Sequence, residues 1–156
     1  MLVAYLQSVA EAGVIGLPPG DLAAGRRAFI EDCSSCHRAH GVGEGLGPNL
    51  SVMTSQRSLE SLVASVRDPD ALVGRGYKLV RLRASENEEI TGLIKSEDAF
   101  SMQLQDDKGR LRSVNKSELQ MVERLSGSLM PEFARSQLSD QRLFDIFNFL
   151  QNGAQS

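Results

Sequence analysis

One five-residue segment constrains this chain more than any other feature: Cys33-Ser34-Ser35-Cys36-His37. It holds both cysteines of the chain and one of its two histidines. Two thiols three residues apart on a helical turn can add across the two vinyl groups of haem, and the next histidine then lies beneath the iron as its proximal ligand. The motif predicts one covalently bound haem c per chain, attached at Cys33 and Cys36, with His37 on the iron.

Three other chemistries use the same residue types. A redox-active Cys-x-x-Cys pair belongs to a βαβ context, whereas this pair ends a helical segment and precedes a glycine-rich loop. A zinc site would have to draw Cys33, Cys36, His37 and His40 from eight consecutive residues. A structural disulfide would leave His37 without a role. We favour haem over these alternatives, and we expect His40 to be an exposed loop side chain that does not bind the iron.

Apolar residues recur with helical spacing in three segments, each preceded by a capping side chain. The predicted helices cover about 21–32, 58–67 and 140–151, with Asp21, Ser58 and Ser139 as their N-caps. Gly41 to Pro48 carries four glycines before its proline and predicts a loop. The long segment between the second and third predicted helices is left to another kind of secondary structure.

Between the second and third helices the apolar period changes to two, which is typical of half-buried strands. Segments 80–84 and 100–104 show the pattern strongly, and 89–95, 110–114 and 120–124 show it weakly. Five short antiparallel strands in about 50 residues predict a small β-barrel. The residues expected to face its core are Val80, Leu82, Phe100, Met102 and Leu104.

Charge and hydropathy exclude two classes of partner. The formal charge of −3 does not suggest the basic surface that a nucleic-acid-binding protein needs. No apolar stretch approaches the ~20 residues of a membrane-spanning helix. Four positive charges without an acid between them lie within nine residues, at Arg75, Lys78, Arg81 and Arg83. Two interpretations of this cluster stay open: a strand that steers an acidic partner, or a solvated strand face without a partner.

Residues 1–17 do not have the composition of a secretory signal, because they contain no Lys or Arg. Residues 2–8 share with 146–152 an order of apolar, aromatic, Leu and Gln positions. Either two amphipathic helices have similar faces, or 1–17 is the end of an upstream unit of the same kind. We expect residues 1–17 to be the end of such an upstream unit.

Several short motifs occur in an order that resembles class I cytochrome c. They are Gly25 and Phe29, Cys33-x-x-Cys36-His37, Gly47-Pro48-Asn49-Leu50, Ser128-Leu129-Met130-Pro131 and the final aromatic helix ending Phe149-Leu150. The departure is an insertion of about 50 residues before the methionine loop. With it, the chain resembles the C-terminal haem-binding domain of large secreted, dehydrogenase-like bacterial proteins. The resemblance implies a mainly α, class I cytochrome c fold around one haem, with the inserted β-barrel.

The resemblance also implies how the haem pocket is built. Gly25 and Phe29 would pack the first helix across the last, against Ile146 and Phe149. The carbonyl of Pro48 would accept the Nδ1 hydrogen of His37 and thereby set its tautomer.

The sixth ligand of the iron has to be one of four methionines. We choose Met130, because it lies between Gly127 and Pro131 in a segment that is neither helix nor strand. Met53 is the runner-up, since it follows the Gly-Pro loop closely. Met102 and Met121 have strand positions that favour a role in core packing.

Taken together, these expectations assign 18–76 and 125–156 to a cytochrome c domain and 77–124 to the β insert. The expected function is electron transfer by a His/Met-ligated haem, with redox donor and acceptor proteins or a fused dehydrogenase domain as partners. The alternative is a haem sensor or peroxidase-like site that opens when Met130 leaves the iron. No second catalytic set is visible, so the domain alone is not expected to be an enzyme. The resemblance implies a periplasmic or extracellular location.

Overall fold

The computed structural model describes residues 16–86 and 88–155, and it divides into two compact units. One unit consists of the described part of Met1–Arg67 together with Glu132–Ser156, and the other is Asp68–Pro131. The prediction for residues 1–17 falls outside the described residues apart from Gly16 and Leu17. Each unit has a hydrophobic core of its own.

The first unit is helical, and its three main helices confirm the sequence-based predictions. Its elements are α2 (Leu22–Asp32), α3 (Met53–Gln56), α4 (Leu59–Arg67), α5 (Asp140–Asn152) and a 3₁₀ turn at Gly153–Gln155. The short helix α3 was not predicted. Side-chain oxygens of Asp21, Ser58 and Ser139 accept hydrogen bonds from backbone N–H groups three residues on, at 2.6, 3.2 and 3.2 Å. Local capping chemistry thus sets where these helices begin.

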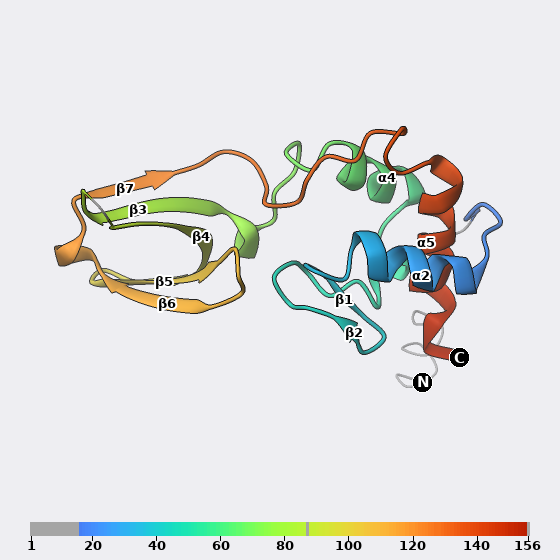
Figure 1. Ribbon diagram of the computed structural model, residues 1–156, viewed down its shortest axis with the longest axis horizontal. Coiled ribbons are helices and arrows are strands. Elements are labelled where there is room, and N and C mark those ends of the chain that lie inside the picture. Colours follow the sequence, from blue (N-terminus) through green and yellow to red (C-terminus); the bar gives the residue numbers. More distant parts are fainter. Residues whose placement is uncertain (1–15, 87, 156) are drawn as a thin grey trace, which may run out of the picture. The chain divides into compact units, whose positions relative to one another are not determined.

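Helices α2 and α5 cross at the centre of this unit (Figure 1). The crossing is close because Gly25 has no side chain: a Cβ there would collide with the Asp145 carbonyl oxygen. The rings of Phe29 and Phe149 pack beside the crossing with centroids 5.5 Å apart. The expected contact of the first helix with the last is therefore present. The buried residues of this core are Ala28, Phe29, Ala39, Leu62, Leu138, Leu143, Ile146, Phe147, Phe149 and Leu150.

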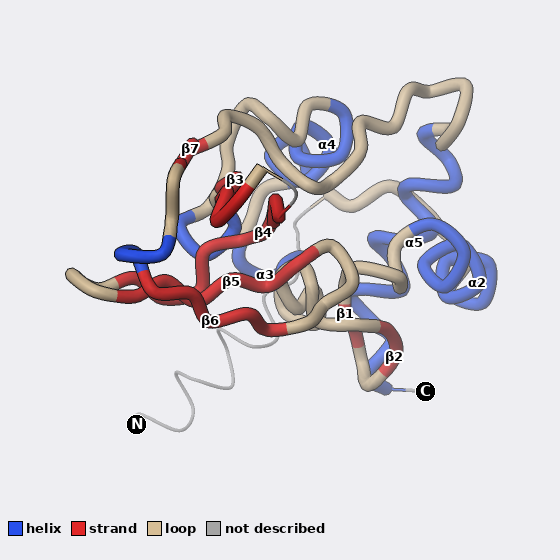
Figure 2. Tube along the Cα trace, turned by 60° about the vertical axis from the view of Figure 1, so that its left-hand side comes forward, coloured by secondary structure: helices blue, strands red, loops and turns tan. Residues whose placement is uncertain are grey.

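A two-residue hairpin follows α2, and Figure 2 shows it as two short red strands. Strands β1 (Arg38–Ala39) and β2 (Val42–Gly43) pair antiparallel. The connecting residues His40 and Gly41 have φ values of 47° and 80°. Positive φ at both central residues is the geometry of a tight hairpin turn, which suits the right-handed twist of paired strands. The predicted loop therefore contains a small ordered turn.

The second unit contains a five-stranded antiparallel sheet. Its strands are β3 (Leu79–Ser85), β4 (Glu88–Glu97), β5 (Ser101–Asp106), β6 (Leu111–Asn115) and β7 (Met121–Arg124), in the order β6-β5-β4-β3-β7. Short 3₁₀ turns precede β3 at Arg75–Tyr77 and β7 at Lys116–Glu118. One face of the sheet buries Val80, Leu82, Met102 and Leu104. All five predicted strands are present.

The predicted fold class is wrong in two respects. The structure is about 33% helix and 26% strand, which is not a mainly α protein. The described strands also form no closed barrel, since β6 pairs only with β5 and β7 only with β3 (Figure 1). Both edge strands are short, and most of their side chains are exposed, with charges at Arg112, Glu123 and Arg124. Short, charged edges favour an open sheet, because such edges resist further strand pairing.

The prediction that Phe100 faces the core of the β unit is wrong. Its side chain is 83% exposed, whereas Met102 and Leu104 are fully buried. The carboxylate of Asp98 accepts hydrogen bonds from the backbone N–H groups of Phe100 and Ser101, both at 2.7 Å. This turn ends immediately before β5 begins, so the alternation of the strand does not extend back to Phe100.

Two residues of the positively charged cluster, Arg81 and Arg83, form cross-strand ion pairs. Arg81 and Glu123 are directly opposite across β3 and β7, and their side chains approach to 3.0 Å. Arg83 and Glu89 are opposite across β3 and β4, at 3.1 Å. These cross-strand pairs give both arginines a structural contact, and the steering of an acidic partner stays a prediction.

Candidate haem site

The Cys33–His37 segment is a tight turn at the C-terminal end of α2. The backbone N–H groups of Cys33 and Ser34 both donate to the Phe29 carbonyl at 2.9 Å, which ends the helix. Cys36 and His37 then donate their N–H groups to the Cys33 carbonyl, at 3.1 and 2.9 Å. Consecutive turns thus place the two cysteines and the histidine on one compact piece of backbone.

Both cysteines are free thiols, and both are partly buried. Burial raises the pKa of Cys33 to about 12, and the neighbouring Asp32 carboxylate adds to this effect. Cys33 therefore stays protonated at neutral pH. A redox-active pair depends on a cysteine whose pKa is lowered instead, so Cys33 is unsuited to that chemistry.

The His37 ring is buried and held in one orientation. Its Nδ1 lies 2.9 Å from the Pro48 carbonyl oxygen. Because a carbonyl only accepts, Nδ1 carries the hydrogen and Nε2 keeps its lone pair. Burial lowers the pKa of His37, while the bond to Pro48 acts in the opposite direction. The ring is thus a neutral imidazole with Nε2 available, which is the form that binds a metal.

The glycine-rich loop packs directly against this ring. A Cβ at Gly47 would lie only 2.5 Å from His37 Cε1 and 2.7 Å from Nδ1, closer than real atoms approach. The Gly47 N–H also donates to the Cys36 carbonyl at 2.7 Å. The loop therefore holds the histidine against Pro48 because residue 47 has no side chain.

These observations fit a haem c site. Two unpaired thiols flank a turn, a neutral histidine presents its free Nε2, and Pro48 orients the ring from behind. Among the described residues, no group of three or more His, Cys, Asp and Glu is placed to hold a metal ion by itself. Cys33 and Cys36 would attach the haem and His37 would bind its iron.

His40 was expected to be exposed, and that expectation is wrong. Its side chain is partly buried, its Nε2 donates to the Leu150 carbonyl at 3.0 Å, and its ring meets Phe149 edge-on with centroids 5.4 Å apart. Its backbone N–H donates to Ser51 Oγ at 3.0 Å. His40 therefore joins the hairpin turn to α5, 110 residues away in the sequence.

Met130 belongs to the other compact unit, in a stretch without helix or strand. Its side chain is partly buried, and its backbone N–H donates to Ser128 Oγ at 3.0 Å. Met102 is fully buried within the sheet core. Met53 packs against the core of the first unit. Of these methionines, Met130 alone lies outside helix and strand.

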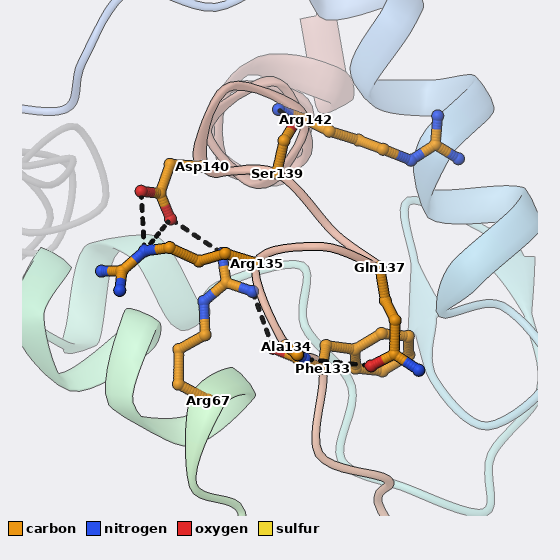
Figure 3. A network of polar contacts seen from close by, with 8 residues as sticks. All are labelled: Arg67, Phe133, Ala134, Arg135, Gln137, Ser139, Asp140 and Arg142. Atoms are coloured by element: carbon orange, nitrogen blue, oxygen red, sulfur yellow. Dashed lines mark hydrogen bonds and ion pairs between the residues drawn. The ribbon is translucent and has the colours of Figure 1, made fainter.

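The first unit resumes after Met130 at a cluster of polar contacts (Figure 3). The Arg67 guanidinium donates to the Phe133 carbonyl at 2.7 Å and to the Asp140 carboxylate at 2.8 Å. Arg135 also pairs with Asp140, and its hydrogen bond is the main reason why the pKa of that carboxyl lies below its usual range. The Phe133 N–H donates to the Val66 carbonyl at 3.2 Å. These contacts join the end of α4 to the returning chain.

Sequence reasoning missed this cluster. Arg67 is 66 residues from Phe133 and 73 from Asp140. Nothing near Arg67 in the sequence distinguishes it from the other basic residues at helix ends, so only the fold identifies its partners.

The helix crossing, the Cys-x-x-Cys-His turn and the proline-bound histidine fit a domain that attaches haem covalently. Comparison with known proteins agrees, because residues 22–83 match the model of the cytochrome c family. The matched segment contains Cys33, Cys36, His37 and Pro48 and ends before Met130. The match supports a class I cytochrome c domain and implies haem c with iron as its cofactor.

One curated relative is cytochrome c-554(547) from Halothiobacillus neapolitanus. It is 42% identical over 45 residues, which are 29% of this chain and 50% of the relative. The alignment thus spans half the length of that protein. Both comparisons support a haem-binding domain of the cytochrome c kind, whose general role is electron transfer. No helix among the described residues is long and apolar enough to cross a membrane.

The contact between Gly47 and His37 leads to a matched pair of variants. Gly47→Ala should displace the His37 ring and lower the free energy of unfolding by about 1–3 kcal/mol, a typical cost of overpacking. Gly45→Ala adds the same methyl group where nothing lies within 4 Å, so it should leave the ring in place. Chemical denaturation and the NMR signal of the His37 Nδ1 hydrogen measure both effects. Equal behaviour of the two variants would contradict the close packing.

Proposed function

We propose that this chain transfers electrons through a covalent haem c whose axial ligands are His37 and Met130, as one domain of a larger redox protein in the periplasm or outside the cell. The cytochrome c part would comprise 18–76 and 125–156, with 77–124 as an inserted module. A fused or docked dehydrogenase would supply the electrons. The matches to cytochrome c proteins support the electron-transfer role.

The buried, proline-bound His37 is the observation that carries the proposal. Its Nδ1 is occupied by the Pro48 carbonyl at 2.9 Å, so only Nε2 can bind iron. The same bond raises the basicity of the ring as a ligand, and it removes the rotational freedom that an exposed histidine would have.

Met130 is proposed as the second axial ligand because its surroundings suit a loop over a haem face. We call residues 127–130 the Met130 turn. The backbone N–H of Met130 donates to Ser128 Oγ, and Pro131, which follows the turn, restricts its backbone. Bound iron would exchange one electron at a relatively high potential, since a thioether favours the ferrous state. Met130 would thus close the iron to outside ligands.

Met130→Ala tests this ligand set. The haem-loaded variant should lose the long-wavelength charge-transfer band that a methionine gives on ferric iron, and its reduction potential should fall. Its ferrous form should bind carbon monoxide readily, because the sixth position is then open. Absorption spectra and a redox titration measure these changes against the unmodified chain.

Met53→Ala is the matched control, because it removes the same side chain from the runner-up position. It should keep the charge-transfer band. If Met53→Ala loses the band and Met130→Ala keeps it, the assignment of Met130 is wrong. If the unmodified chain itself binds carbon monoxide or cyanide readily, the iron is open and a sensor or peroxidase-like site replaces electron transfer.

A further inference from the structure

We propose that Asp70 is a positioning residue that holds Met130 in place, an inference that rests on the proposed ligand role of Met130. Asp70 lies just after α4, 58 residues before its partner Ser128, and both belong to the Asp68–Pro131 unit. Its effect would be exerted through the backbone of the methionine turn.

Two hydrogen bonds connect the Asp70 carboxylate to the Met130 backbone. Asp70 Oδ1 accepts the N–H of Ser128 at 2.7 Å. The hydroxyl oxygen of Ser128 in turn accepts the N–H of Met130 at 3.0 Å. The first bond is charge-assisted and short, and such bonds are about twice as strong as neutral ones. The Met130 turn is therefore tied to a charged group outside it.

Gly127 allows the carboxylate to approach so closely. Its φ of +101° lies in the region that favours glycine. A Cβ at this position would lie 3.2 and 3.3 Å from the two Asp70 carboxylate oxygens. The backbone conformation thus favours glycine where the chain turns toward Met130, and the Asp70 carboxylate packs closely beside it.

The Asp70 side chain starts from a restrained backbone. Pro69 precedes it and fixes its own φ, and the Ala71 N–H donates to the Asp68 carbonyl at 3.3 Å in a turn. Since Asp70 sits inside this turn, its carboxylate is presented at a defined place. A restrained acceptor lowers the entropy that the Met130 turn must lose when the thioether binds the iron.

The expected consequence is competition between Met130 and outside ligands. Imidazole can replace the methionine on ferric iron only if the turn moves away. Removing the Asp70 carboxylate weakens the hold on the turn, so Asp70→Ala should bind imidazole on the order of tenfold more tightly than the unmodified chain. The charge-transfer band of the methionine should weaken in parallel, while the haem stays attached.

The experiment titrates imidazole into the haem-loaded full-length chain and its variants. Asp68→Ala is the matched control, because it removes the same side chain two residues earlier, at an exposed position whose carboxylate makes no hydrogen bond among the described residues. It should match the unmodified chain. Asp70→Asn keeps an acceptor oxygen, so its affinity for imidazole should stay close to the weaker affinity of the unmodified chain. Ser128→Ala removes only the second link and should shift the affinity in the same direction as Asp70→Ala.

The outcomes separate this proposal from the one on which it rests. If Met130→Ala strengthens imidazole binding but Asp70→Ala behaves as Asp68→Ala, the Asp70 proposal fails and the ligand assignment stands. If Asp70→Ala lowers only the unfolding temperature, its role is structural and the proposal also fails. If Met130→Ala changes neither the band nor imidazole binding, Met130 is not the ligand, and both proposals fall. Should Asp70→Ala not fold, Ser128→Ala still decides the question, because it removes the second link of the same path.

Discussion

A chain with alanine at both Cys33 and Cys36 is expected to carry no covalently bound haem. The unmodified protein, produced together with haem-ligation machinery, should gain the mass of one haem that survives denaturation. The double variant should show only the mass of the polypeptide, because no other cysteine in the chain can form the thioether bonds. Mass spectrometry of the denatured proteins measures this all-or-none difference.

The intervening serines provide the control for this prediction. Ser34→Ala and Ser35→Ala change the same turn but leave both thiols in place, so each variant should keep its haem. Ser34 Oγ donates to the Ile30 carbonyl, a bond that only helps to end α2. An unmodified chain without added haem mass would contradict the whole interpretation of the site.

Gly25→Ala is expected to lower the free energy of unfolding by about 3 kcal/mol, at the upper end for overpacking. A loss of stability would be informative, because alanine within a helix otherwise stabilises a protein by about 0.5–1 kcal/mol relative to glycine. The added Cβ would collide with the Asp145 carbonyl oxygen, which belongs to the rigid backbone of α5. Separation of α2 from α5 would relieve the collision at the cost of the contact between Phe29 and Phe149.

Chemical denaturation of the haem-loaded variant measures this effect. Ala23→Gly, on the exposed face of the same helix, serves for comparison and should cost only about 1 kcal/mol through helix propensity. A stabilised Gly25→Ala variant would show that α2 and α5 do not pack as closely as described here.

Local chemistry made most elements predictable. Asp21 and Ser139 cap helices whose bounds agree with prediction to within a residue, and the change of period marks the β segment. Two wrong predictions concern the start of one strand and the closure of the sheet. Phe100 continues the alternation of β5, yet an Asp98 turn places it outside the strand. The sheet is open because its two end strands do not pair with each other, a choice that no local pattern encodes.

Cys33, Cys36 and His37 are neighbours in the sequence, so their spacing alone predicts a haem site. Which distant residues form hydrogen bonds with one another becomes visible only in the folded structure. His40 bonds to Leu150 across 110 residues, and Asp70 bonds to Ser128 across 58. Such contacts depend on chain segments that meet only after folding, and a single sequence carries no separate trace of them.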